Sequence, residues 1–146
     1  MSWNPGHKVV HVGIDPGVNV GFAISHKGKL LQLSTLTFWE AVQELEQLAE
    51  GAQLHVYIEN PNANKPTFWK QGAESQKARE KISQNVGANK RDAQLLIEKV
   101  ELLGVKVLPV PPKTKKFTAD SFRKLSGWES TCSQHARDAA MLVLGR

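Results

Sequence analysis

Residues 9–24 read VVHVGIDPGVNVGFAI, and this stretch decides how we expect the rest of the chain to fold. Its first residues are rich in β-branched side chains without helical spacing, which predicts a strand buried on both faces that ends at Asp15. Pro16 and two glycines follow, so the chain must turn before a second strand over residues 21–25. A carboxylate at a buried strand end is costly unless it meets a cation, a metal or a helix N-terminus. The alternative is an aspartate that only caps its own turn.

The length and cysteine content of the chain limit its architecture and its compartment. A chain of 146 residues fits one domain, over residues 1–146, with a core that needs no disulfide. The single cysteine, Cys132, excludes an intrachain disulfide, and with one cysteine in the chain we do not expect a structural zinc site. We therefore expect a reducing, cytoplasmic location, and we find no signal peptide or apolar run long enough to span a membrane.

The charge of the chain favours an anionic partner. Nineteen Lys and Arg against 14 Asp and Glu give a net charge of +5 and an isoelectric point near 9.4. This balance puts nucleic acid ahead of a membrane surface as the expected partner. The alternative is a cationic face that is only solvated.

The remaining periodicity predicts an α/β fold. The first two strands and a strand over residues 29–35 should be antiparallel neighbours, because only a short glycine-containing loop joins the last two. Thr37 is placed to cap a helix. The other predicted elements are helices over residues 38–50, 89–103, 118 or 120–125 and 133–144, and buried strands over residues 54–58 and 105–110. Together they indicate a mixed five-stranded sheet with helices on both faces.

Three acids lie at separate landmarks of this expected fold. Asp15 ends the first strand, Glu59 follows the strand over residues 54–58, and Asp138 shares a face of the last helix with His135. Parallel neighbours bring their carboxyl ends together, and a helix laid on the sheet can add a third acid and an imidazole. Such a ligand set suits Mg²⁺ or Mn²⁺ better than a soft-ligand metal. Two ions about 3.5–4 Å apart can activate water and stabilise the leaving oxygen of a phosphodiester. For His135, the alternative is a core histidine that is only hydrogen-bonded.

Basic and aromatic residues indicate where nucleic acid would bind. Two aromatic residues lie in a lysine-rich segment, where they either stack on bases or pack on the core. Two basic residues open the helix after that segment, and three lysines follow the last strand, where they would neutralise backbone phosphates or form a solvated loop. The residues that we assign to DNA binding are Phe68, Trp69, Lys90, Arg91, Lys113, Lys115 and Lys116.

Several segments, taken together, resemble the RuvC-type Holliday-junction resolvases of the ribonuclease H-like superfamily. They are GIDPGVNVGFAI, YIEN, NKRDAQLLIEKVELLG followed by VKVLPVPP, and HARDAA, and they span nearly the whole chain. The first motif alone also fits sugar-kinase and actin-like ATPases, but 146 residues cannot supply their two domains. The resemblance implies a ribonuclease H-like fold in which Asp15, Glu59 and Asp138 are metal-binding catalytic acids. His135 stands where relatives carry either Asp or His.

The resemblance also implies an activity and an assembly. It indicates a Mg²⁺-dependent endodeoxyribonuclease, acting as a homodimer that makes paired nicks in a four-way junction and leaves 5′-phosphates. It further implies that lysines of the loop after the last strand lie against the scissile phosphate. The segment after Glu59 departs from the resolvase loop that carries an aromatic residue to the junction centre. Two alternatives remain: a related nuclease acting on RNA or other branched DNA, and a junction-binding module without catalysis.

Overall fold

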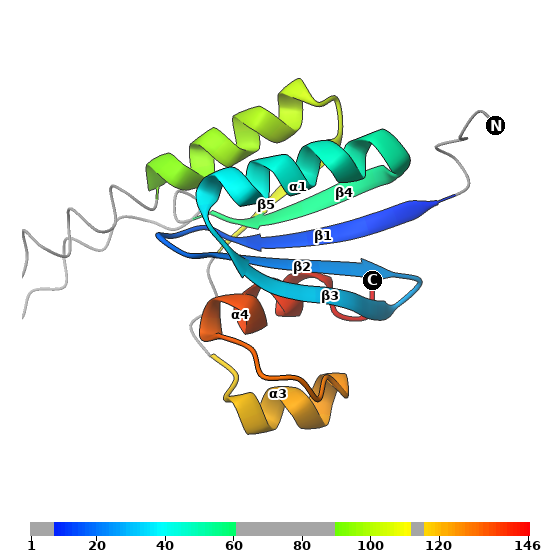
Figure 1. Cartoon of the computed structure of the whole chain (residues 1–146), viewed down its shortest axis with the longest axis vertical. Helices are drawn as coiled ribbons and strands as arrows, with labels where there is room; N and C mark the ends of the chain where they lie inside the picture. Colours follow the sequence, from blue (N-terminus) through cyan, green and yellow to red (C-terminus); the bar gives the residue numbers. More distant parts are fainter. Residues whose placement is uncertain (1–7, 61–89, 112–115) are drawn as a thin grey trace, which may run out of the picture.

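The fold is built on an open, mixed sheet of five strands in the order β3-β2-β1-β4-β5 (Figure 1). The computed structural model describes residues 8–60, 90–111 and 116–146. Strands β1, β2 and β3 are antiparallel neighbours, whereas β1, β4 and β5 run parallel to one another. The strands are β1 (Val9–Asp15), β2 (Val20–His26), β3 (Lys29–Leu36), β4 (Gln53–Glu59) and β5 (Lys106–Val110). This confirms the prediction of a mixed five-stranded sheet in which the first three strands of the chain are antiparallel.

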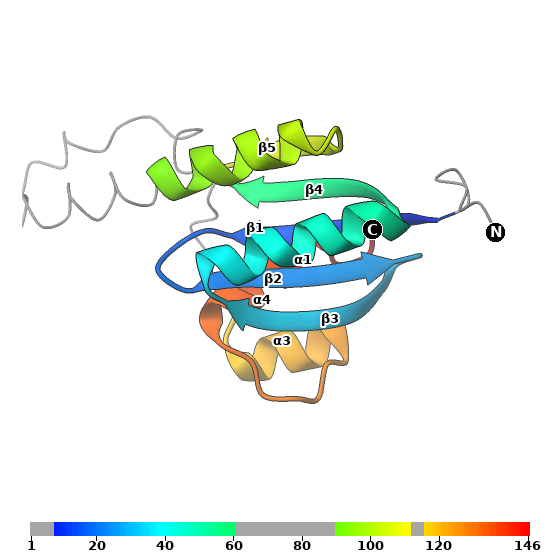
Figure 2. The same cartoon turned by 45° about the horizontal axis from the view of Figure 1, so that its top comes forward.

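Helices cover both faces of this sheet (Figures 1 and 2). One face carries α1 (Phe38–Gly51) and a helix over residues 90–102; the other carries α4 (Gln134–Val143), with α3 (Ala119–Ser126) packed outside it. Thr37 caps α1 in a capping box with Glu40, as the sequence predicts for the cap. Thr118, one of the two predicted starts, caps α3. No helix in the described part of the chain is long and apolar enough to cross a membrane.

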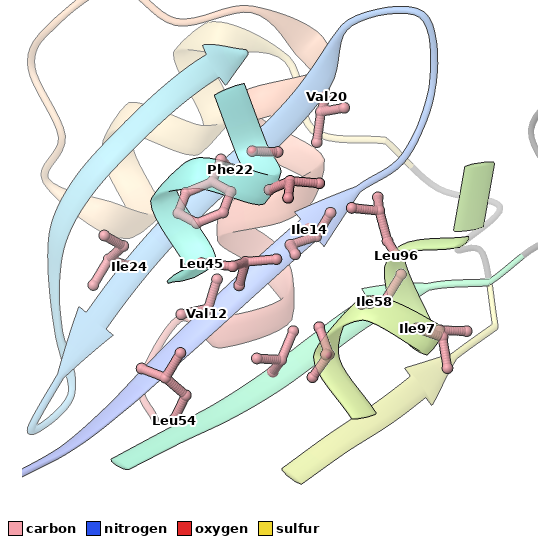
Figure 3. Close-up of a cluster of buried hydrophobic side chains, with 14 of the residues drawn as sticks. Val12, Ile14, Val20, Phe22, Ile24, Leu45, Leu54, Ile58, Leu96 and Ile97 are labelled. Carbon is pink, nitrogen blue, oxygen red and sulfur yellow. The ribbon is translucent and has the colours of Figure 1, made fainter. Parts of the chain in front are cut away.

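The larger core lies between the sheet and the pair formed by α1 and the helix over residues 90–102 (Figure 3). Every second side chain of β1 points into this core. Val12 and Ile14 of β1 are fully buried there, as are Phe22 and Leu45. Since successive strand residues point to opposite faces, the intervening residues of β1, including Asp15, face α4. The alternation thus directs the acid to the second face.

Two glycines let the backbone of α4 lie directly against that second face. A Cβ on Gly13 would overlap the carbonyl oxygen of Ala139, and a Cβ on Gly21 would overlap the carbonyl oxygen of His135. Both positions therefore need a residue without a side chain for α4 to keep its place. The α4 contacts involve β1, β2, β3 and β4, so this helix is held by most of the sheet.

The prediction that the last strand is buried was wrong, because β5 is the edge of the sheet. In the described residues it pairs only with β4, and Leu108 is 47% exposed. Pro109 lies inside the strand, where its missing N–H is tolerated at an edge. The apolar composition of this segment indicated a strand but not its place in the sheet.

Candidate metal centre

Three carboxylates from three separate elements meet at one edge of the sheet. Asp15 ends β1 and Glu59 ends β4, and these parallel strands are in register, with Ile14 level with Ile58. Asp138 comes from α4. One carboxylate oxygen of each acid lies within 4.8 Å of the others. The structure thus brings together the three acids that the sequence analysis selected.

Helix α4 can lie close to the end of β1 because the residue paired with Asp15 on β2 has no side chain. That partner is Gly21, the residue on which the backbone of α4 rests at His135. The start of the helix is also tied to β3, because the hydroxyl of its N-cap, Ser133, lies 2.6 Å from Thr35 Oγ1. These contacts fix the start of α4, and Asp138, one turn further along the helix, therefore lies near Asp15 and Glu59.

The three carboxyl groups are close enough to affect the pKa of Asp15. Burial raises the pKa of Asp15 to about 8, with further contributions from the charges of Glu59 and Asp138 and from a hydrogen bond with Glu59. Asp15 is only 8% exposed, so little water is available to stabilise its charge. The raised pKa favours the protonated form of Asp15, and an added positive charge nearby would favour the carboxylate. All three groups are hard oxygen donors, which fits Mg²⁺ or Mn²⁺.

Lys116 supplies one positive charge to this cluster. Its Nζ donates a hydrogen bond of 3.0 Å to Asp138 Oδ2 and lies 3.7 Å from Glu59 Oε1. Burial lowers the pKa of Lys116, but the bond to Asp138 and the nearby carboxylates outweigh this, and the pKa lies above its ordinary value. Lys116 therefore contacts the acid cluster, while 44% of its side chain stays exposed to solvent.

His135 lies beside the cluster and contacts one member of it. Its Nδ1 forms a hydrogen bond of 3.2 Å with Asp15 Oδ2, and 47% of its side chain is exposed. The alternative of a core histidine is therefore wrong. The set of mutually close ligand atoms in the described residues consists of the three acids alone, so the imidazole acts on the cluster through Asp15 in this structure.

Two further polar residues reach the site, and the sequence analysis gave them no role. Gln134 Nε2 donates a hydrogen bond of 2.8 Å to Asp138 Oδ1, and Arg137 Nη2 donates one of 3.0 Å to Gln134 Oε1. The i, i+4 spacing of Gln134 and Asp138 on one helix is the signal that could have found the first contact. The i, i+3 spacing of Gln134 and Arg137 is the same kind of signal for the second contact.

A small hollow borders the acids on the side of β5 and α4. Glu59, Asp138 and Lys116 line part of it, so their charged side chains border this hollow. Its complete lining is Glu59, Pro111, Lys116, Phe117, Asp138, Met141 and Leu142.

The remaining predicted DNA-binding residues divide into two groups. Lys90 and Arg91 open the helix over residues 90–102, which begins at the same end of the molecule as the β1–β2 loop (Figure 1). Arg91 is exposed there. The predictions for Phe68, Trp69, Lys113 and Lys115 fall outside the described residues.

No model of a known protein family matches this chain, and neither does any curated protein.

Proposed function

We propose that this chain is a Mg²⁺- or Mn²⁺-dependent endonuclease with a ribonuclease H-like fold, acting on branched DNA and preferring four-way junctions. The convergence of Asp15, Glu59 and Asp138 within 4.8 Å at the carboxyl ends of parallel strands carries the proposal. The net charge of +5 and the resemblance described above support DNA as the substrate. By the same resemblance we propose a homodimer, since paired nicks need two sites.

The three carboxylates would hold the metal, and their roles follow from their surroundings. When bound, divalent ions would supply the charge that activates a water and stabilises the leaving oxygen of a phosphodiester, and we propose two ions per site. Asp15 must release its proton to serve as a ligand, and the charge of a bound divalent ion would favour that release. His135 Nδ1 contacts Asp15 Oδ2 at 3.2 Å and would hold this carboxyl group in place. Glu59 and Asp138 lie closer to Lys116, which offsets part of their charge.

Lys116 has a second part in the proposal. Its ammonium is near the acids and borders the hollow, so it is positioned to contact a phosphate oxygen of a bound strand. A lysine would act there as a point charge and would not read bases. Lys90 and Arg91, on the helix over residues 90–102, would bind the DNA backbone.

The experiment that tests this function offers the protein several labelled substrates with and without Mg²⁺. A four-way junction, a linear duplex, a flap and an RNA–DNA hybrid should be compared at equal concentration. We expect Mg²⁺-dependent nicking of the junction in two strands, leaving 5′-phosphates, and slower cutting of the duplex. Preferential cutting of the hybrid would instead assign the site to RNA, and cutting of the flap alone would assign another branched DNA.

One observation favours a second candidate, a junction-binding module without catalysis. Lys116 already provides a charge to Glu59 and Asp138, so part of the cluster could serve as an internal ion-pair network. Such a module would bind the junction with the same affinity with or without Mg²⁺ and would not nick it. The substrate panel separates the two candidates, because it measures binding and cleavage on the same DNA.

A further inference from the structure

The carboxylate of Asp138 is held at both of its oxygens. Oδ2 accepts from Lys116, and Oδ1 accepts from Gln134 at 2.8 Å. A side chain held at both ends has little freedom to rotate, so the direction in which Asp138 faces depends on these two donors. The contacts that hold Lys116 and Gln134 in place therefore also affect the orientation of Asp138.

The amide of Gln134 can bridge Arg137 and Asp138 in only one orientation. A guanidinium only donates hydrogen bonds and an ionised carboxylate only accepts them, whereas an amide has one group of each kind. Gln134 therefore presents Oε1 to Arg137, at 3.0 Å, and Nε2 to Asp138. Without Arg137, the amide would lose the partner that keeps its donor towards the acid.

Arg137 also holds the segment that carries Lys116. Its Nε donates to the carbonyl oxygen of Phe117 at 3.2 Å, one residue after Lys116, and its Nη1 donates to the carbonyl oxygen of Cys132 at 2.8 Å. One planar guanidinium thus links the segment before α3, the segment that enters α4 and the side chain of Gln134. Its fixed fork makes such a three-way link possible, and lysine has no equivalent geometry.

We propose that Arg137 is a positioning residue for the candidate metal centre, acting on Asp138 through Gln134 and on Lys116 through the backbone at Phe117. As a statement about metal binding, this inference rests on the proposed function. As a statement about the orientation of Asp138, it stands on the hydrogen bonds alone. Partners of metal ligands commonly change metal affinity by about 10- to 100-fold when they are removed.

The test compares Gln134→Met, Arg137→Met and the double variant with the wild-type chain. Arg123→Met, on α3 outside the site, is the control for loss of an arginine. Three-bond NMR couplings, recorded without metal, report the χ1 rotamer of Asp138. Mn²⁺ affinity, measured by electron paramagnetic resonance without DNA, reports the ligand set. Thermal unfolding identifies variants that have lost their fold.

We expect a single Asp138 rotamer in the wild type and averaged couplings in both single variants. Mn²⁺ affinity should fall by about 10-fold or more in each, and the double variant should be no weaker than Arg137→Met, because both act along one path. Arg123→Met should match the wild type. If Arg137→Met does not fold, Gln134→Met still decides the step from Gln134 to Asp138.

Unchanged Asp138 couplings in the folded variants would overturn the inference, as would additive losses in the double variant. Averaged couplings in a protein whose wild type binds no Mn²⁺ would support the positioning role and overturn the proposed function. The two failures are therefore distinguishable.

Discussion

The ammonium of Lys116 lies 3.0 Å from Asp138 Oδ2, so the cluster of acids contains a cation of its own before any metal arrives. Lys116 also lies 3.7 Å from Glu59, and its charge lowers the pKa of Asp15, against the larger effects that raise it. A divalent ion that binds the acids must share them with this ammonium or displace it. The lysine can therefore oppose metal binding and still assist the reaction.

Replacing Lys116 by alanine should separate these two effects. Lys116→Ala removes a competing cation, which should raise metal affinity, and also a donor that orients Asp138, which should lower it, so metal affinity should change less than in Gln134→Met. The single-turnover cleavage rate should fall by about 10²-fold, because the charge that stabilises the attacked phosphate is lost. Lys124→Ala, which removes a surface ion pair with Asp120, is the matched control and should change neither quantity. An unchanged cleavage rate in Lys116→Ala would limit this lysine to the ion-pair network.

The raised pKa of Asp15 predicts how stability depends on pH in the metal-free protein. The folded state keeps the proton up to about pH 8, whereas the unfolded chain releases it near the ordinary value of 3.8. Between these values the folded state binds more protons, so the Asp15 contribution to stability declines as pH rises and levels off above about pH 8.

Urea unfolding of the wild type and of Asp15→Asn, from about pH 5 to about pH 9, measures this contribution as a difference. The advantage of Asp15→Asn should grow with pH up to about pH 8 and then level off. Added Mg²⁺ should stabilise the wild type more at the high end, where the carboxylate loses its proton more easily. A pH-independent difference between the two proteins would show that Asp15 is ionised throughout.

His135 should matter through its contact with Asp15. His135→Ala removes a hydrogen bond of 3.2 Å and should lose most of the cleavage activity, since Asp15 loses its neighbour. His135→Asp should retain activity only if a bound metal takes a ligand at this position, as the resemblance implies, because the new carboxylate would then supply it; if His135 acts through Asp15 alone, this variant should lose activity as His135→Ala does. Single-turnover rates over a range of Mg²⁺ concentrations provide the comparison. Near-normal rates in both variants would make His135 a bystander.

Gly21 should be a structural requirement of the site. In Gly21→Ala the new Cβ would meet the backbone of α4 at His135, and backbone cannot move aside as a flexible side chain can. We expect a loss of about 3 kcal/mol in unfolding free energy, together with weaker metal binding. Gly51→Ala is the matched control, because its Cβ would meet nothing within 4 Å. Equal stability of the two variants in urea unfolding would show that α4 does not rest on Gly21.

Much of the site was predictable because its signals are local. Asp15 and Glu59 each follow a buried apolar run and precede a turn signal, and parallel pairing then places them at one edge. The placement of α4 follows less directly from sequence, since it depends on small residues such as Gly21 whose role appears only when the backbone of another element lies over them.

Other features depend on contacts that no local pattern encodes. The pairing of Lys116 with Asp138 joins residues 22 positions apart, and the loop that carries the lysine has no periodic signal. The edge position of β5 depends on the order of strands in the sheet, which apolar composition does not specify. The bond from Arg137 to the carbonyl oxygen of Phe117 joins residues 20 positions apart, so the link from this arginine to the segment of Lys116 has no local signal.

The central claim is that Asp15, Glu59 and Asp138 form one catalytic metal site. Its most direct test is single-turnover cleavage of a labelled four-way junction with Mg²⁺ by the wild type and by Asp15→Asn, Glu59→Gln and Asp138→Asn, with junction affinity measured alongside across salt concentrations. Each substitution removes ligand charge and keeps the shape, so cleavage should fall to the metal-free background while affinity is retained, because binding rests on phosphate contacts. Mg²⁺-dependent cleavage near the wild-type rate in any of the three variants would contradict the claim for that residue, and in all three it would place the active site elsewhere.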